Sequence, residues 1–177
     1  MFRYLYCCSL LVIGLLVVAC GSSSPKANPD GLLLSCYRAD DISCRIEAEI
    51  VRLSNEKRAE QGLKPFKQSF ESSFAARQWS QQQAQTRSIS HQGFPSERQE
   101  VIRREFSGLQ LSLLAENVAA GVPSTDNPTM IAGYFVELWW NSPGHRQNIL
   151  GSYQFMGAGI ASDTDQGIYR YATQLFH

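Results

Sequence analysis

Two histidines and one glutamate lie in three separate segments of the chain, each in or beside a stretch that can turn. His91 lies in a polar segment, Glu116 lies near the end of the apolar run 109–119, and His145 directly follows Pro143 and Gly144. Neutral imidazoles are good ligands for zinc and other divalent ions, and a carboxylate can serve as a third ligand or can orient a ligating histidine. If the fold brings the three together, they form either a ligand-binding cleft or a purely structural polar cluster.

Helical periodicity and capping residues predict the helices that would position these groups. Asp40 or Asp41 can cap a first helix that ends at Gly62, where a left-handed residue is favoured. Ser69 opens a second helix that fades near residue 86, with the glutamine run 81–83 on its solvated face. A third helix runs from about residue 129 to residue 140, and residues 96–99 have the pattern of a capping box that starts a shorter one.

Strands are predicted towards the end of the chain. Residues 155–161 and 168–176 are rich in β-forming residues and flank a polar segment typical of a hairpin. The pattern of residues 109–119 fits a strand or a helix equally well. Helices followed by strands indicate the α+β class with an antiparallel sheet.

The beginning of the chain is predicted to be a leader, residues 1–19. Arg3 precedes a run of about fifteen apolar residues, which is short for a membrane span and suits a signal peptide. The end of this run, Val17-Val18-Ala19-Cys20, resembles the bacterial lipobox, in which the cysteine receives diacylglycerol and the chain is cut before it. We therefore expect Cys20 to be lipidated; the alternative is an ordinary signal peptide or an uncleaved anchor.

A flexible linker is expected to follow, over residues 20–40, because Ser, Pro, Asn and Gly dominate much of this stretch. Residues 41–177 are then long enough for one domain with its own core. Cys36 and Cys44 lie outside the leader, and in an exported protein a disulfide between them is the simplest prediction. Two free thiols are the alternative.

The charges of the chain exclude one class of partner. Sixteen basic and sixteen acidic residues balance, and no basic stripe stands out. We therefore expect no nucleic-acid partner.

A set of motifs appears in one order over about residues 45–177 and comprises the segments 53–59, 62–66, 90–93, 116–119, 139–150, 157–160 and 171–176. This ordered set resembles the CAP superfamily, also called the SCP domain, which includes cysteine-rich secretory, antigen-five and pathogenesis-related proteins. The bacterial branch is the most similar.

The resemblance implies an α-β-α sandwich with a small antiparallel sheet between helical layers. It also implies a cleft lined by His91, Glu116 and His145. Eukaryotic members have a second glutamate shortly after the tryptophan of the third helix. Here that position is Ser142, and Glu137 would point to a different side of the helix, so three residues are carried over.

Two functions remain open at this stage. The first is an exported binding or interaction module, tethered to a membrane through Cys20, whose cleft takes a lipid-like or protein ligand or a zinc ion at His91 and His145. The second is a metal-dependent hydrolase that uses the same cleft. The residue directly after Cys20 is Gly21 and not an aspartate. By resemblance to bacterial lipoproteins, this favours sorting to the outer membrane in a cell with two membranes.

Overall fold

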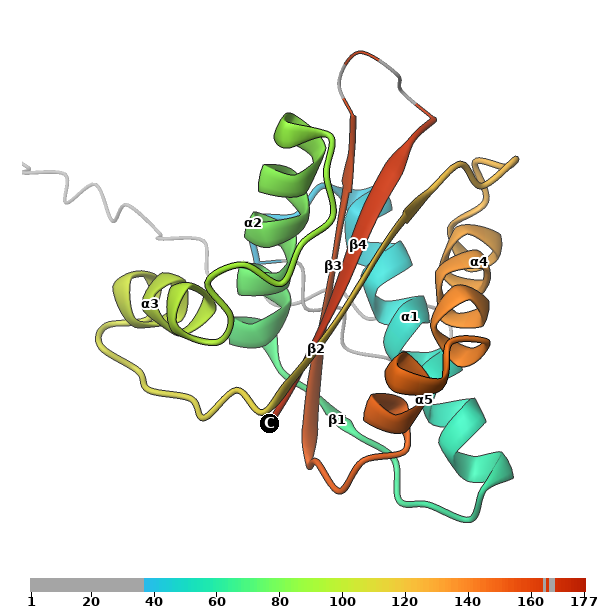
Figure 1. Cartoon of the computed structure of the whole chain (residues 1–177), viewed down its shortest axis with the longest axis horizontal. Helices are drawn as coiled ribbons and strands as arrows, with labels where there is room; N and C mark the ends of the chain where they lie inside the picture. Colours follow the sequence, from blue (N-terminus) through green and yellow to red (C-terminus); the bar gives the residue numbers. More distant parts are fainter. Residues whose placement is uncertain (1–36, 164, 166–167) are drawn as a thin grey trace, which may run out of the picture.

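A computed structural model describes residues 37–163, 165 and 168–177, and the predicted leader, Cys20 and Cys36 lie outside these residues. Figure 1 shows the elements in order along the chain. They are α1 (Asp41–Glu60), β1 (Lys67–Gln68), α2 (Phe70–Thr86), α3 (Ser96–Glu105), β2 (Ala115–Gly121), α4 (Pro128–Trp140), α5 (Pro143–Ile149), β3 (Phe155–Ser162) and β4 (Arg170–Phe176).

The strands form one sheet in the order β1-β3-β4-β2. β3 and β4 make the predicted antiparallel hairpin, and β4 also pairs antiparallel with β2, from Ala115 opposite Phe176 to Gly121 opposite Arg170. The two-residue strand β1 pairs with β3 in parallel. The predicted α+β class is confirmed, but the sheet is mixed and not wholly antiparallel.

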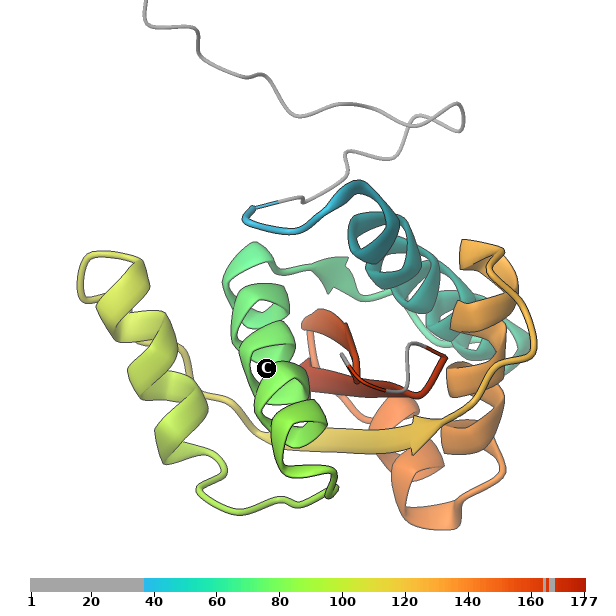
Figure 2. The same cartoon turned by 90° about the horizontal axis from the view of Figure 1, so that it is seen from above.

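Helices cover both faces of the sheet, which confirms the sandwich (Figure 2). On one side α2 lies against the sheet with α3 outside it, and on the other side lie α1, α4 and α5. The larger apolar core joins α1 to α4 and the sheet and contains Ile50, Phe135, Trp139, Met156 and Phe176. A smaller cluster between α2, α3 and the sheet is centred on Ile102 and Leu175.

Two glycines of β3 allow α2 to lie directly on the sheet. A Cβ atom at Gly159 would overlap the backbone nitrogen of Arg77, and one at Gly157 would overlap the carbonyl carbon of Ser72. Any side chain at these positions would therefore push the helix away from the strand.

Two of the three helix caps predicted from the sequence are present in the structure. The Asp40 carboxylate accepts hydrogen bonds from the backbone N–H groups of Ile42 and Ser43, and the Ser69 hydroxyl accepts one at the start of α2. The capping box at residues 96–99 was wrong, because α3 begins at Ser96 itself behind Pro95 and has no side-chain cap. None of the described helices is long and apolar enough to cross a membrane.

The segment around His145 also differs from the prediction. Pro143 and Gly144 do not form a separate turn before it, because they are the first residues of α5, which follows α4 after two residues. His145 therefore lies in the first turn of a short helix beside β2.

Candidate functional site

The three predicted site residues come from three different elements. His91 lies in the loop between α2 and α3, Glu116 is the second residue of β2, and His145 is in α5. The Nδ2 of Asn117 donates to the backbone oxygen of His145 over 3.1 Å, and the Nδ2 of Asn148 donates to the Asn117 Oδ1 over 2.8 Å. These bonds fix α5 to the strand residue next to Glu116.

Glu116 lies at the centre of the polar cluster. Its Oε1 lies 2.9 Å from the His91 Nδ1, and its Oε2 accepts a hydrogen bond of 2.8 Å from the Arg98 Nε. A second Arg98 nitrogen donates to Oε1 over 3.2 Å, so the arginine holds the carboxylate through both oxygens. The Glu116 side chain is 1% exposed, whereas that of His91 is 55% exposed.

Arg98 is buried among groups that orient it. Its guanidinium carbon lies 3.3 Å from the centre of the Trp79 ring, and its Nη1 donates to the backbone oxygen of Gln92 over 2.8 Å. The Trp79 Nε1 in turn donates to the backbone oxygen of Ser90, one residue before His91. The arginine thus connects α2, α3, β2 and the loop that presents His91.

Arg98 belongs to the site but was not among the residues predicted from the sequence. It falls in the segment interpreted as a capping box, although Ile102 four residues later is fully buried on the same helix face. An arginine in line with the buried positions of an amphipathic helix indicates an internal carboxylate partner, and this was the signal available.

His145 is only partly exposed, and its imidazole is influenced by the other histidine. Burial lowers the pKa of His145, and the neighbouring His91 lowers it further. His145 is therefore neutral at pH 7. The predicted direct approach of the two imidazoles to one shared ligand stays a prediction.

Glu137 is not part of this cluster. Its carboxylate forms an ion pair of 2.7 Å with Lys57, on the α1 side of α4. The predicted three-residue cleft thus gains Arg98, not a second glutamate.

Only some of the three predicted site residues are free to serve as ligands of a metal ion. Within residues 37–163, 165 and 168–177, no group of three or more His, Cys, Asp or Glu side chains is arranged to hold a metal ion. Both oxygens of Glu116 are already bonded to Arg98, which removes this carboxylate as a direct ligand and leaves it to orient His91 from behind. His91 and His145 are the two imidazoles that remain.

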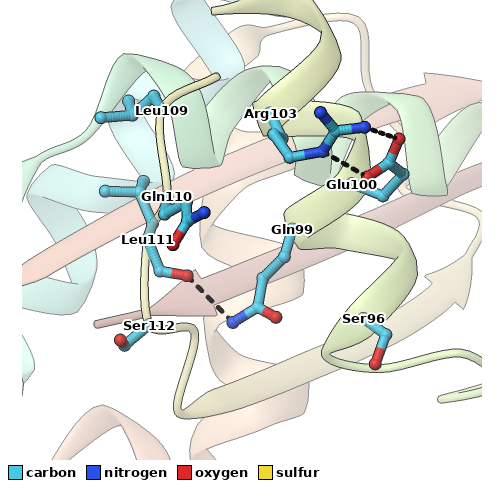
Figure 3. A pocket seen from close by; sticks show the side chains of 8 residues that line it. All are labelled: Ser96, Gln99, Glu100, Arg103, Leu109, Gln110, Leu111 and Ser112. Carbon is cyan, nitrogen blue, oxygen red and sulfur yellow. Dashed lines mark hydrogen bonds and ion pairs between the residues drawn. The ribbon is translucent and has the colours of Figure 1, made fainter.

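A separate open pocket of about 330 Å³ lies between α3 and the segment that follows it (Figure 3). Arg103 and Glu100 at its rim pair with each other over 2.7 Å, and the Gln99 amide donates to the backbone oxygen of Leu111. None of the three predicted site residues lines this pocket, and its charged groups are already paired, so it has no clear ligand chemistry.

The sequence of residues 51–176 matches the profile of the cysteine-rich secretory protein family, CAP. A curated relative, the uncharacterized protein YkwD of Bacillus subtilis, is 31% identical over 114 residues. The match covers 64% of this chain and 41% of YkwD, so the chain spans about two fifths of that relative's length.

Solved structures with the same fold come from several bacteria. An extracellular protein containing a SCP domain from Bacillus anthracis matches with a TM-score of 0.57 at 16% identity, over 85% of this chain and 44% of that one. An outer surface protein from Borrelia burgdorferi matches with a TM-score of 0.52 at 16% identity, over 72% and 88% of the two chains. At such identities the likeness shows the fold alone.

Proposed function

Because the chain belongs to the cysteine-rich secretory protein (CAP) family, we propose that it is an exported, membrane-tethered binding module. His91 and His145 are the ligand-contacting groups of its cleft. The apolar leader that ends in Cys20 supports export and tethering, and the extracellular and outer-surface descriptions of the two structural neighbours are consistent with export alone.

The observation that supports binding is the state of Glu116. Arg98 and His91 between them occupy both oxygens of its buried carboxylate. A general base must be free to accept a proton from a substrate or from water, and a glutamate held in this way is not. Glu116 instead orients His91, and the cleft presents an oriented imidazole to a ligand.

The alternative, a metal-dependent hydrolase, is less well supported by the same residues. Catalytic zinc sites have three protein ligands and one open position for water. His91 and His145 supply two nitrogens, and the carboxylate that would be third is bonded to a guanidinium. Two imidazoles can still hold a divalent ion when a ligand completes its coordination, and zinc is therefore the first probe of the cleft.

Calorimetry with zinc tests the proposal on the purified full chain and on three single variants. His91→Ala and His145→Ala should each lose most of the zinc binding, because each removes one of the two nitrogens. His177→Ala is the matched control and should bind as the wild type does, since the His177 ring stacks on Phe155 at the start of β3, a strand that contributes no residue to the candidate site. Equal affinity in all four proteins would exclude the two histidines as the metal contacts.

Native mass spectrometry of the same preparation distinguishes the ligand classes. A co-purifying lipid-like molecule without turnover supports the binding module. A bound metal together with turnover of an ester or peptide substrate would instead establish the hydrolase.

A further inference from the structure

The buried Arg98 is not a ligand-contacting group, yet it contacts both Glu116 and the loop that carries His91. It is 2% exposed and therefore does not meet a ligand in the cleft. Its contacts include the two oxygens of Glu116, the face of Trp79 and the backbone oxygen of Gln92. We propose that Arg98 is the positioning residue that fixes which nitrogen of His91 is offered to the ligand. This inference rests on the binding function proposed above.

The first step is the charge of Glu116. A carboxylate that is 1% exposed is strongly disfavoured as an ion unless it is paired and hydrogen-bonded. Arg98 satisfies both conditions, since its fork donates to both oxygens and its own charge cannot be removed by deprotonation in proteins. Arg98 therefore supplies both the opposite charge and the hydrogen bonds that this buried carboxylate needs, and its donors occupy both oxygens.

The second step is the tautomer of His91. An ionised carboxylate accepts hydrogen bonds and donates none. Because the His91 Nδ1 lies 2.9 Å from Glu116 Oε1, this nitrogen must carry the proton. In neutral His91 the Nε2 is then without a proton, and its lone pair points away from Glu116.

The third step is the effect of losing the arginine. Without Arg98, the buried Glu116 has two ways to compensate. It can take up a proton and donate it to the His91 Nδ1, or it can draw a second proton onto His91 and form an ion pair with the imidazolium. In both cases the His91 Nε2 carries a proton, and the cleft loses its lone pair.

The neighbouring residues are arranged to keep Arg98 in place. The Trp79 ring covers one face of the guanidinium, and the Trp79 Nε1 holds the backbone of Ser90. The same arginine that sets the His91 tautomer thus also fixes the loop on which His91 lies, through Gln92 and Trp79. A lysine could keep the charge but not the two parallel bonds or the flat stacking.

Nitrogen-15 NMR of the histidine side chains tests this proposal directly, because protonated and unprotonated ring nitrogens give distinct shifts. The full exported chain is measured in detergent at a mildly alkaline pH, and the His91 signals are assigned with His91→Gln. In the wild type we expect a proton on Nδ1 and none on Nε2. A protonated Nε2 in the wild type would overturn the proposal without any variant.

Arg98→Met is the decisive variant, and Arg104→Met is its control on the same helix, since the Arg104 side chain is 67% exposed. Arg98→Met should place a proton on the His91 Nε2 and weaken zinc binding by about 10–100-fold, the usual effect of losing a group that orients a metal ligand. Arg104→Met should change neither. An unprotonated Nε2 in folded Arg98→Met would overturn the proposal.

Arg98→Lys keeps the proposal testable if Arg98→Met does not fold. In Arg98→Lys we expect the fraction of His91 with a protonated Nε2 to be larger than in the wild type. If Arg98→Met also folds, the fraction in Arg98→Lys should be smaller than in Arg98→Met. An unchanged tautomer in Arg98→Lys, together with unfolded Arg98→Met, would show that Arg98 acts on stability alone. If the wild type binds no zinc but the tautomers respond as expected, the positioning role stands and only the zinc contact fails.

Discussion

At the scale of single residues, two buried arginines pair with two buried glutamates. Arg98 holds Glu116 beside His91, and Arg77 holds Glu47 between α1 and α2 with bonds of 2.7 and 2.5 Å. Arg77 also donates to the backbone oxygen of Tyr37, at the start of the described chain. The first pair belongs to the candidate site, and the second links α1 to α2.

The Glu47 pair makes the stability of the domain depend on pH. Burial raises the pKa of Glu47 to about 7 from 4.5, although Arg77 and the Ile160 N–H lower it. The folded state therefore binds this proton more tightly than the unfolded state does. Stability from this group is fully present below pH 4.5 and is lost as the pH rises through about 7.

Glu47→Gln should remove this dependence. Relative to the variant, the free energy of unfolding of the wild type should fall between pH 4.5 and pH 7 and then stay level. Urea unfolding at a series of pH values measures it. Glu60→Gln, at the exposed end of the same helix, should keep the wild-type pH profile. Parallel profiles of the wild type and Glu47→Gln would contradict the prediction.

At the scale of the elements, the contact of α2 with β3 depends on the absence of side chains at two strand positions. An alanine at Gly159 would drive its Cβ into the backbone of Arg77, which only a movement of the whole helix can relieve. Since α2 also holds Trp79 and Arg77, such a movement would reach both arginine pairs.

Gly159→Ala should therefore lower the free energy of unfolding by at least about 1–3 kcal/mol, the usual cost of overpacking. Gly144→Ala is the control, because a Cβ there meets no atom within 4 Å, and its effect should stay within about 0.5 kcal/mol. Thermal unfolding of both variants measures the difference. If the two variants melt together, α2 does not lie as close to β3 as described.

The elements also show what could be predicted from the sequence. The helices α1, α2 and α4 and the hairpin of β3 and β4 follow from local caps and periodicity, and their predicted bounds agree within a few residues. β1 was missed because two residues hold no periodic signal and pair only once β3 is in place. α5 was missed because seven residues beginning with Pro-Gly lack a helical pattern, and side chains of Asn117 and Arg58 bond to its backbone.

The candidate site was predictable to a similar degree. The segment motifs identified His91, Glu116 and His145, and the structure joins His91 to Glu116. The helical spacing of Arg98 and Ile102 indicates a buried arginine, but the identity of its partner depends on a contact between α3 and β2 that no local pattern encodes. The same applies to Gln83, which was predicted to lie on a solvated face but is buried against Thr173.

At the scale of the whole molecule, the predicted attachment to a membrane rests on the leader, which precedes the described residues. Cys20→Ser should abolish labelling with palmitate and release the protein from membranes, because it removes the sulfur that would accept the lipid. Fractionation and labelling of cells measure both effects. Ser22→Ala, in the same stretch, should change neither, and unchanged labelling in Cys20→Ser would contradict the prediction of a lipoprotein.

The predicted disulfide would connect the linker to the domain. Cys44 is buried in the first turns of α1, and its predicted partner Cys36 lies outside the described residues, so the pairing stays a prediction. The closed loop is short, and the expected stabilisation is about 2–3 kcal/mol by chain entropy. Peptide mapping without reductant should find the two cysteines linked, and alkylation of both in the folded exported protein would show otherwise.

The strand order also determines when the domain can fold. β4 is the last strand of the described chain, yet it lies between β3 and β2, so β2 has no sheet neighbour until residues 170–176 have been made. Synthesis runs from the N-terminus, and pairing between such distant segments is slow. A nascent chain that stops before residue 170 therefore cannot pair β2, and the site around Glu116 forms only after residues 170–176 have been made. This order of events suits a protein that is threaded through a translocation channel before it folds.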